Sequence, residues 1–229
     1  MKEKPDTFLR KVSLFADLPD EDLKKIVRLT RIRQYRKQEV IFYADDPGTA
    51  LFILKSGMVK ISVMDKDLRE VILKLLYPGD FFGEMALLDG QHRSATVTAM
   101  ERSEAVVLDR EAFLSILRQK PELILTMLLT VCRRLRQTDE KIRSLVFADA
   151  YGKVAETLLR LINEKGERGD DGVSIELPFS TKDLASLVGI TRQTLSKVLK
   201  EYQRAGVIKM LRRQIHILDE ARLQREALS

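Results

Sequence analysis

One short segment carries side chains suited to binding a phosphorylated sugar. Residues 78–97 read PGDFFGEMALLDGQHRSATV. Gly83 lets backbone amides approach a ligand closely, and the Glu84 carboxylate can accept a hydrogen bond from a sugar hydroxyl. The planar guanidinium of Arg93 matches the oxygens of a phosphate, and Ser94 adds a hydroxyl and an amide. A purely structural ion pair between Arg93 and Glu84 is the alternative interpretation that these residues leave open.

A second segment, near the C-terminus, is strongly basic. Residues 189–217 contain seven Lys and Arg against the single acid Glu201, and this balance of +6 equals the formal net charge of all 229 residues. The basic residues are Arg192, Lys197, Lys200, Arg204, Lys209, Arg212 and Arg213. A basic helix followed by a hairpin, on an otherwise neutral chain, is typical of a surface that docks on the phosphates of nucleic acid.

Two helices joined by a glycine turn are predicted to present this basic segment. Residues 180–183, Ser-Thr-Lys-Asp, form a capping box that begins a helix over 182–187, and Gly189 suits the turn after it. Thr191 caps a second helix that extends from residue 192 to about residue 205. Apolar residues from both helices supply one core: Leu184, Ala185, Val188, Ile190, Leu195, Val198 and Leu199.

The opposite face of the second helix carries side chains that can read DNA bases. They are Arg192, Gln193, Ser196 and Lys197. In a helix-turn-helix, the first part of the second helix enters the major groove, where Arg and Lys suit guanine and Gln suits adenine. Further polar residues are candidates for contacts with the DNA backbone: Thr181, Lys182, Thr191, Thr194 and Lys200. An ordinary solvated helix face is the competing interpretation.

Cysteine and histidine content excludes several classes of site. Cys132 is the only cysteine, and the two histidines, His92 and His216, are far apart in sequence. We therefore expect no disulfide, metal site, haem or iron–sulfur cluster. No apolar run reaches the roughly 18 residues that span a bilayer, and no signal-peptide core is present. The sequence predicts a cytoplasmic protein that makes no membrane contact.

The first half of the chain changes its hydrophobic pattern near residue 40. Residues 5 to about 34 show helical spacing, and short apolar runs separated by turn residues then follow. The predicted strands are 40–42, 51–54, 59–63, 71–76, 96–99 and 105–108. Many short strands with regular turns predict an antiparallel sandwich or barrel.

A long helix over residues 121–148 is predicted to join two subunits. Its apolar seam repeats with alternating spacings of four and three residues: Ile124, Leu128, Val131, Leu135, Ile142 and Leu145, with Thr138 as the one polar member. Such a heptad seam favours a parallel coiled coil, although a helix packed on its own domain is the alternative. Thr138 could fix the register of the two helices or face a ligand at their interface. Asp149 can cap the next helix, so residues 146–150 are a candidate hinge.

The segment GEMALLDGQHRSA, at residues 83–95, resembles the cyclic-nucleotide cassette of the cyclic AMP receptor protein and fumarate–nitrate regulator family. The similarity extends over nearly the whole chain. It implies an α+β fold with an antiparallel β-roll of the jelly-roll type over residues 1–120, a dimerisation helix over 121–148 and a winged helix-turn-helix over 149–229. It also implies a homodimeric transcription regulator rather than an enzyme. Its expected partners are double-stranded DNA with a pseudo-palindromic site and RNA polymerase, and its expected allosteric effector is cyclic AMP.

The same resemblance assigns the nucleotide to residues of the roll and of the long helix: Gly83, Glu84, Met85, Arg93, Ser94, Thr138 and Asp139. In the cyclic AMP receptor protein, a Thr-Ser pair on the long helix binds adenine, so Thr138 matches and Asp139 departs. A carboxylate can still accept a hydrogen bond from the adenine amino group. The family's Arg-Glu-x-x-x-Arg on the DNA-reading helix becomes Arg-Gln-x-x-x-Lys over residues 192–197, so we expect a different half-site. A regulator of the same fold with another effector, or none, is the alternative function.

Overall fold

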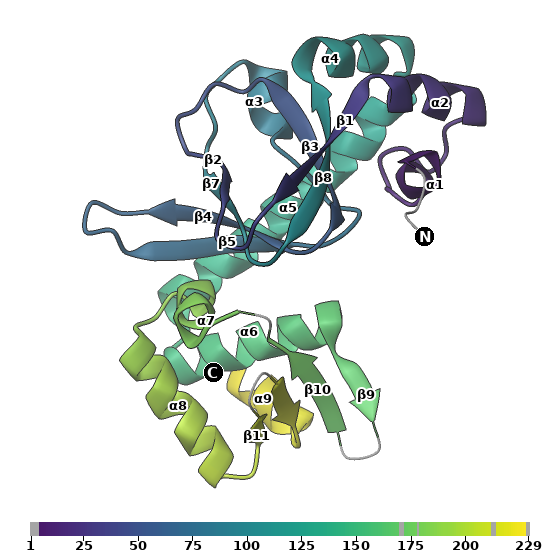
Figure 1. Ribbon diagram of the computed structural model, residues 1–229. Helices are drawn as coiled ribbons and strands as arrows, with labels where there is room; N and C mark the ends of the chain where they lie inside the picture. The colour runs from purple at the N-terminus through teal and green to yellow at the C-terminus, as the bar shows by residue number, and fades with distance from the viewer. Residues whose placement is uncertain (1–4, 170–171, 178, 212–213, 228–229) are drawn as a thin grey trace. The chain divides into compact units, whose positions relative to one another are not determined.

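The computed structural model describes residues 5–169, 172–177, 179–211 and 214–227 (Figure 1). The chain divides into two compact units, Met1–Val63 with Leu73–Arg136, and Met64–Ile72 with Gln137–Ser229. No helix within the described ranges is long and apolar enough to cross a membrane.

Two four-stranded sheets form the β-roll, as the alternating pattern predicts. The strands of the first sheet are, in spatial order, β1 (Thr30–Tyr35), β8 (Ser103–Asp109), β3 (Ala50–Ser56) and β6 (Phe81–Phe82). Those of the second are β2 (Val40–Phe42), β7 (Thr96–Ala99), β4 (Val59–Met64) and β5 (Glu70–Leu76). The six predicted strands are present, and β1 and β6 were not predicted.

Alternation along the central strands β3 and β8 builds two cores. In β3, Leu51 and Ile53 pack with the helices, whereas Phe52 and Leu54 pack between the two sheets. We call the second set the inner core. Successive side chains of a strand point to opposite faces, so one strand can serve both cores. The inner core also contains an aromatic cluster in which the Phe52 and Phe82 rings stack with their centroids 5.2 Å apart.

Five helices accompany the roll along the chain: α1 (Pro5–Arg10), α2 (Asp20–Arg28), α3 (Glu84–Asp89), α4 (Arg110–Gln119) and α5 (Glu122–Phe147). The prediction of helix up to residue 34 is wrong, because residues 30–35 form the edge strand β1. Their partner is β8, with Thr30 opposite Leu108 and Tyr35 opposite Ser103. The helical spacing of residues 20–28 does not continue through residues 30–35, because these residues pair with the buried strand β8.

The long helix α5 buries one side and exposes another. Leu123 and Met127 are 4% and 3% exposed and pack in the core shared with the helices. The predicted seam residues Ile124, Leu128, Leu135, Ile142 and Leu145 are between 37% and 60% exposed. The observed helix begins and ends within one residue of the prediction.

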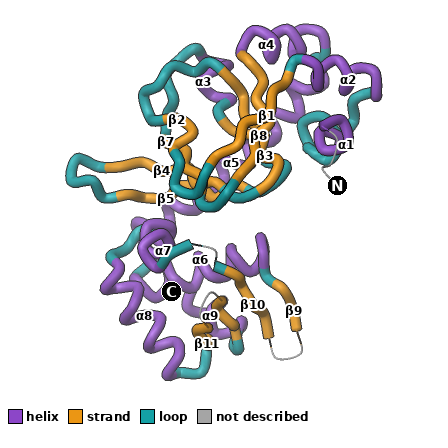
Figure 2. The backbone as a smooth tube through the Cα atoms, in the orientation of Figure 1, coloured by secondary structure: helices purple, strands orange, loops and turns teal. Residues whose placement is uncertain are grey.

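The second unit contains a helix-turn-helix and a small sheet (Figure 2). Its helices are α6 (Ala150–Lys165), α7 (Thr181–Val188), α8 (Arg192–Arg204) and α9 (Glu220–Ala227). The sheet has the strand order β11 (Ile208–Leu211), β12 (Gln214–Ile217), β10 (Gly172–Glu176) and β9 (Glu167–Gly169). This arrangement confirms the predicted winged helix. Two residues of the basic count, Arg212 and Arg213, lie outside the described residues.

Candidate functional site

Arg93 is held inside the β-roll by backbone carbonyls and an aromatic ring. Its side chain is almost fully buried. Nη1 donates to the carbonyl oxygen of Gly83 at 2.6 Å, and Nη2 donates to that of Ala50 at 2.8 Å. The guanidinium carbon lies 4.3 Å from the centroid of the Phe42 ring, a cation–π contact. We call this arrangement the Arg93 cradle.

Burial and the nearby carboxylates act in opposite directions on the charge of Arg93. Burial lowers the pKa of Arg93, and the nearby carboxylates of Glu84 and Asp46 act in the opposite direction. The buried Nε atom of Arg93 has no hydrogen-bond partner among the described residues. A buried donor left unpaired costs about 1–3 kcal/mol, so the cradle is suited to an added anionic oxygen.

Position 83 strongly favours glycine. Gly83 precedes α3 with φ +81°, in the left-handed region that favours glycine. A Cβ atom there would lie 2.5 Å from Nη1 of Arg93 and 3.3 Å from the carbonyl oxygen of Ala50. The lack of a side chain therefore lets the backbone of Gly83 approach the Arg93 guanidinium.

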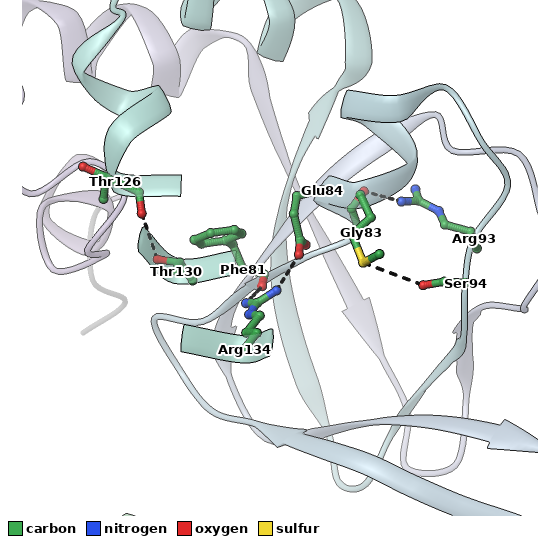
Figure 3. A network of polar contacts seen from close by, with 9 residues as sticks. Phe81, Gly83, Glu84, Arg93, Ser94, Thr126, Thr130 and Arg134 are labelled. Atoms are coloured by element: carbon green, nitrogen blue, oxygen red, sulfur yellow. Dashed lines mark hydrogen bonds and ion pairs between the residues drawn. The ribbon is translucent and has the colours of Figure 1, made fainter. Parts of the chain in front are cut away.

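Glu84 pairs with a residue that the sequence interpretation did not include (Figure 3). Its Oε1 accepts a hydrogen bond from Nη1 of Arg134 on α5 at 2.7 Å, and the Glu84 side chain is almost fully buried. Arg134 also donates to the carbonyl oxygen of Phe81 and lies over that ring, 4.8 Å from its centroid. The structural ion pair considered for Arg93 and Glu84 is thus formed with Arg134 instead. Arg134 precedes Thr138 by four residues, so the two share one face of α5. This spacing is the sequence signal that could have identified Arg134 as a site residue.

The other predicted ligand residues are more exposed. Met85 is 53% exposed, and its Sδ accepts a weak hydrogen bond from the Ser94 hydroxyl at 3.9 Å. Thr138 and Asp139 are exposed residues of α5 and belong to the second unit. Within the first unit, the structure brings Gly83, Glu84 and Arg93 together beside Met85 and Ser94.

The helix-turn-helix has the local interactions that the sequence predicts. The Ser180 hydroxyl oxygen accepts from the backbone N–H of Asp183 at 3.2 Å, and the Asp183 carboxylate accepts from the backbone N–H of Ser180 at 3.1 Å. Gly189 has φ +83° at the turn. The Thr191 hydroxyl caps α8 by accepting from the backbone N–H of Thr194 at 3.1 Å. These short-range contacts fix where α8 begins.

One face of α8 is buried and the other is polar and exposed. The buried residues are Leu195, Val198, Leu199 and Tyr202. On the other face, Arg192, Gln193, Lys197 and Lys200 are exposed, and Ser196 is half-buried. Of the backbone-contact candidates, Thr181, Lys182 and Thr191 are exposed, and Thr194 is half-buried with its hydroxyl bonded to that of Thr191. The polar face can therefore enter a groove without disturbing the core.

Comparison with known proteins assigns both halves of the chain. Residues 32–120 match the model of a cyclic nucleotide-binding domain, and residues 152–226 match that of a Crp-like helix-turn-helix domain. The cyclic AMP receptor protein of Thermus thermophilus is 34% identical over 197 residues, which cover 86% of this chain and 88% of that protein. The chain belongs to the CRP/FNR family. It is a DNA-binding transcription regulator with a cyclic nucleotide-binding domain, not an enzyme.

Other members of the CRP/FNR family extend the similarity. A CRP-like cAMP-activated global transcriptional regulator of Mycobacterium tuberculosis is 29% identical over 222 residues, covering 97% of this chain and 99% of that protein. The solved structure of a CRP-family regulator from Thermus thermophilus has a TM-score of 0.72 at 26% identity. The match covers 86% of this chain and 97% of the chain in that structure. In the part of this family member that the structure describes, no group of three or more His, Cys, Asp or Glu residues is placed to hold a metal ion.

Proposed function

We propose that this chain is a homodimeric, sequence-specific regulator of transcription whose DNA binding is controlled by cyclic AMP. The observation that carries the proposal is the Arg93 cradle, a buried cation near the buried Glu84 carboxylate with an N–H donor that no described residue accepts from. Its guanidinium has further N–H groups beyond those that donate to Gly83 and Ala50, so a cyclic phosphate can bind without displacing those carbonyls. Glu84 would accept a hydrogen bond from the ribose hydroxyl, and Ser94 would add a donor to the phosphate.

The adenine base is assigned to the long helix. Thr138 of one subunit and the partner's Asp139 would contact it, one helical turn beyond Arg134 on α5. Relatives described as a cyclic AMP receptor protein and as a cAMP-activated regulator support adenine over other bases. The proposal divides the chain into an effector domain over residues 1–120, a dimerisation helix over 121–148 and a DNA-binding domain over 149–229.

Control of DNA binding follows from contacts that depend on both subunits. A nucleotide bridging two α5 helices is bound fully in one arrangement of those helices, so it shifts the population toward that arrangement. The hinge near Asp149 would then place the two α8 helices roughly 34 Å apart, one turn of DNA, on a pseudo-palindromic site. RNA polymerase is the proposed further partner, and we propose a cytoplasmic location because the expected partners, DNA and RNA polymerase, would be found there.

Calorimetric titration of the purified protein with cyclic AMP, and with cyclic GMP as control, tests this function. We expect binding with a dissociation constant on the order of micromolar for cyclic AMP and much weaker binding for cyclic GMP. Absence of binding by either nucleotide would contradict cyclic AMP control. That outcome would favour a different effector or none, with Asp139 as the departure that explains it.

Replacing Lys200 by alanine should weaken binding to all DNA sequences alike. Lys200 is an exposed cation of α8, on the same polar face as the base-reading candidates, and we assign it to a phosphate. Losing one phosphate contact should reduce the slope of log K against log salt by about 1. Fluorescence anisotropy over a salt series measures both quantities. Arg192→Ala is the matched comparison and should instead relax the preference at one base pair. A sequence-selective loss for Lys200→Ala would contradict its assigned role.

A further inference from the structure

The C-terminal helix α9 is joined to the first turn of α6 and to the end of α8. Leu223 of α9 is completely buried. A Cβ atom on Gly152, in the first turn of α6, would lie 3.1 Å from the carbonyl oxygen of Glu226. This close approach places the last turn of α9 directly against the residues that follow the candidate hinge.

Tyr202 connects the three helices through its hydroxyl. It lies in the last turns of α8 and is 2% exposed. Its hydroxyl oxygen is 2.6 Å from Oε2 of Glu226 on α9 and 3.0 Å from the carbonyl oxygen of Tyr151 on α6. The other carboxylate oxygen of Glu226 accepts from Nε of Arg222 at 3.1 Å. Glu226 is therefore oriented from both sides.

A second hydroxyl joins two of these helices, α6 and α8. Tyr151 donates to a carboxylate oxygen of Glu201, the residue that precedes Tyr202 in α8. The rings of Tyr151 and Tyr202 are edge-to-face, with their centroids 6.0 Å apart. Burial raises the pKa of Tyr202, and the hydrogen bond to Glu201 raises that of Tyr151, so both hydroxyls keep their protons at neutral pH.

The apolar contacts of α8 hold it on the core, and their close packing limits its direction only in part. Leu195, Val198 and Leu199 are buried, and apolar burial is favourable without being directional. Hydrogen bonds depend on both distance and angle, so the Tyr202 and Tyr151 contacts restrict rotation as well as separation. The hydroxyl pair therefore adds a directional constraint to the packing of the core.

We propose that Tyr202 and Glu226 are positioning residues for DNA reading, and that α9 acts as a brace that sets the angle of α8 relative to the start of α6. This inference rests on the proposed DNA-reading role of α8. The 13 residues of α8 span about 20 Å, and a tilt of about 10° about its C-terminal end would move its N-terminal end by about 3 Å. Hydrogen bonds to base edges tolerate a range of only about 0.5 Å. Arg192 and Gln193 would thus lose base readout while the helix remained basic and folded.

The test compares specific and non-specific DNA binding by full-length variants. A duplex site is first selected by the wild-type protein from a random-sequence pool, with and without cyclic AMP, and a scrambled duplex of equal length is the non-specific probe. We expect Tyr202→Phe and Glu226→Ala to lower the ratio of specific to non-specific affinity by about 10-fold, with little change in non-specific affinity or in its salt slope. Glu226→Gln keeps an acceptor oxygen and should restore most of the ratio. Gln224→Ala, an exposed position of α9, is the control and should leave the ratio unchanged.

The possible outcomes distinguish a role of Tyr202 and Glu226 in orienting α8 from a role in keeping the protein folded. An unchanged ratio in Tyr202→Phe and Glu226→Ala would overturn the proposal. Equal losses of specific and non-specific affinity, in proportion to the folded fraction measured by circular dichroism, would also overturn it, because they would show a purely structural role. A wild-type protein that selects no sequence under either condition would instead contradict the proposed function.

Discussion

Replacing Arg93 by lysine is expected to lower the affinity for cyclic AMP by at least about 100-fold, because the loss of two charge-assisted hydrogen bonds costs about 3 kcal/mol or more. Lysine keeps the positive charge but loses the planar fork. In the wild-type protein the fork donates to Gly83 and Ala50 and still has N–H groups for a phosphate. A single ammonium group cannot serve the same carbonyls and a phosphate in that geometry. Calorimetric titration of the variant measures the loss.

Arg102→Lys is the matched control for this experiment. Arg102 is an exposed arginine in the turn that precedes β8, and its Nη2 donates a long hydrogen bond of 3.5 Å to Oε1 of Gln34. We expect wild-type affinity for this variant. Thermal unfolding of Arg93→Lys distinguishes loss of the site from loss of the fold. Wild-type cyclic AMP affinity in a folded Arg93→Lys protein would show that the cassette does not bind the nucleotide phosphate.

The double change Leu128→Glu with Leu135→Glu is expected to convert the proposed dimer into monomers. The two side chains are 55% and 60% exposed in the single chain and lie on the predicted seam of α5. Burying a leucine contributes about 1.5–3 kcal/mol, and a dimer would bury both positions on both subunits. Charged residues at these positions would also place like charges close together across the seam. Sedimentation equilibrium measures the oligomeric state.

DNA binding provides a second measurement on the same variant. A monomer reaches one half-site, so its affinity for a palindromic duplex should fall by about 1,000-fold, because the second half-site otherwise binds at a high effective concentration. Leu29→Glu changes a leucine of similar exposure, 51%, at the end of α2 and should remain dimeric. A Leu128→Glu, Leu135→Glu protein that stays dimeric would place the subunit interface elsewhere and support the alternative in which α5 packs on its own domain.

Local signals made the DNA-reading half predictable from the sequence. Ser180 with Asp183, Gly189 and Thr191 act within a few residues of the helix ends that they define, so their effect is independent of the rest of the fold. The strands between residues 40 and 108 were predictable for a related reason, since their alternation and turn residues are also local.

Elements that depend on distant partners were missed. The edge strand β1 carries four consecutive exposed residues and becomes a strand by pairing with β8, more than 60 residues later in the chain. The strand β6 has 2 residues and α3 has 6, which are too few for a periodic pattern to emerge. Arg134 was missed because its partner Glu84 lies 50 residues away, and the basic run around it resembles an ordinary solvated helix face.

The Nε of Arg93, which no described residue accepts from, also bears on the choice of buffer. A buried guanidinium recognises tetrahedral oxygens in general, so inorganic phosphate and sulfate present the same groups as the cyclic phosphate. An anion that occupies the cradle stabilises the folded chain by mass action and must be displaced before the nucleotide can bind. Apparent affinity for cyclic AMP would then depend on the concentration of the competing salt. Titrations of this protein therefore belong in an amine or zwitterionic buffer with chloride as the counter-ion.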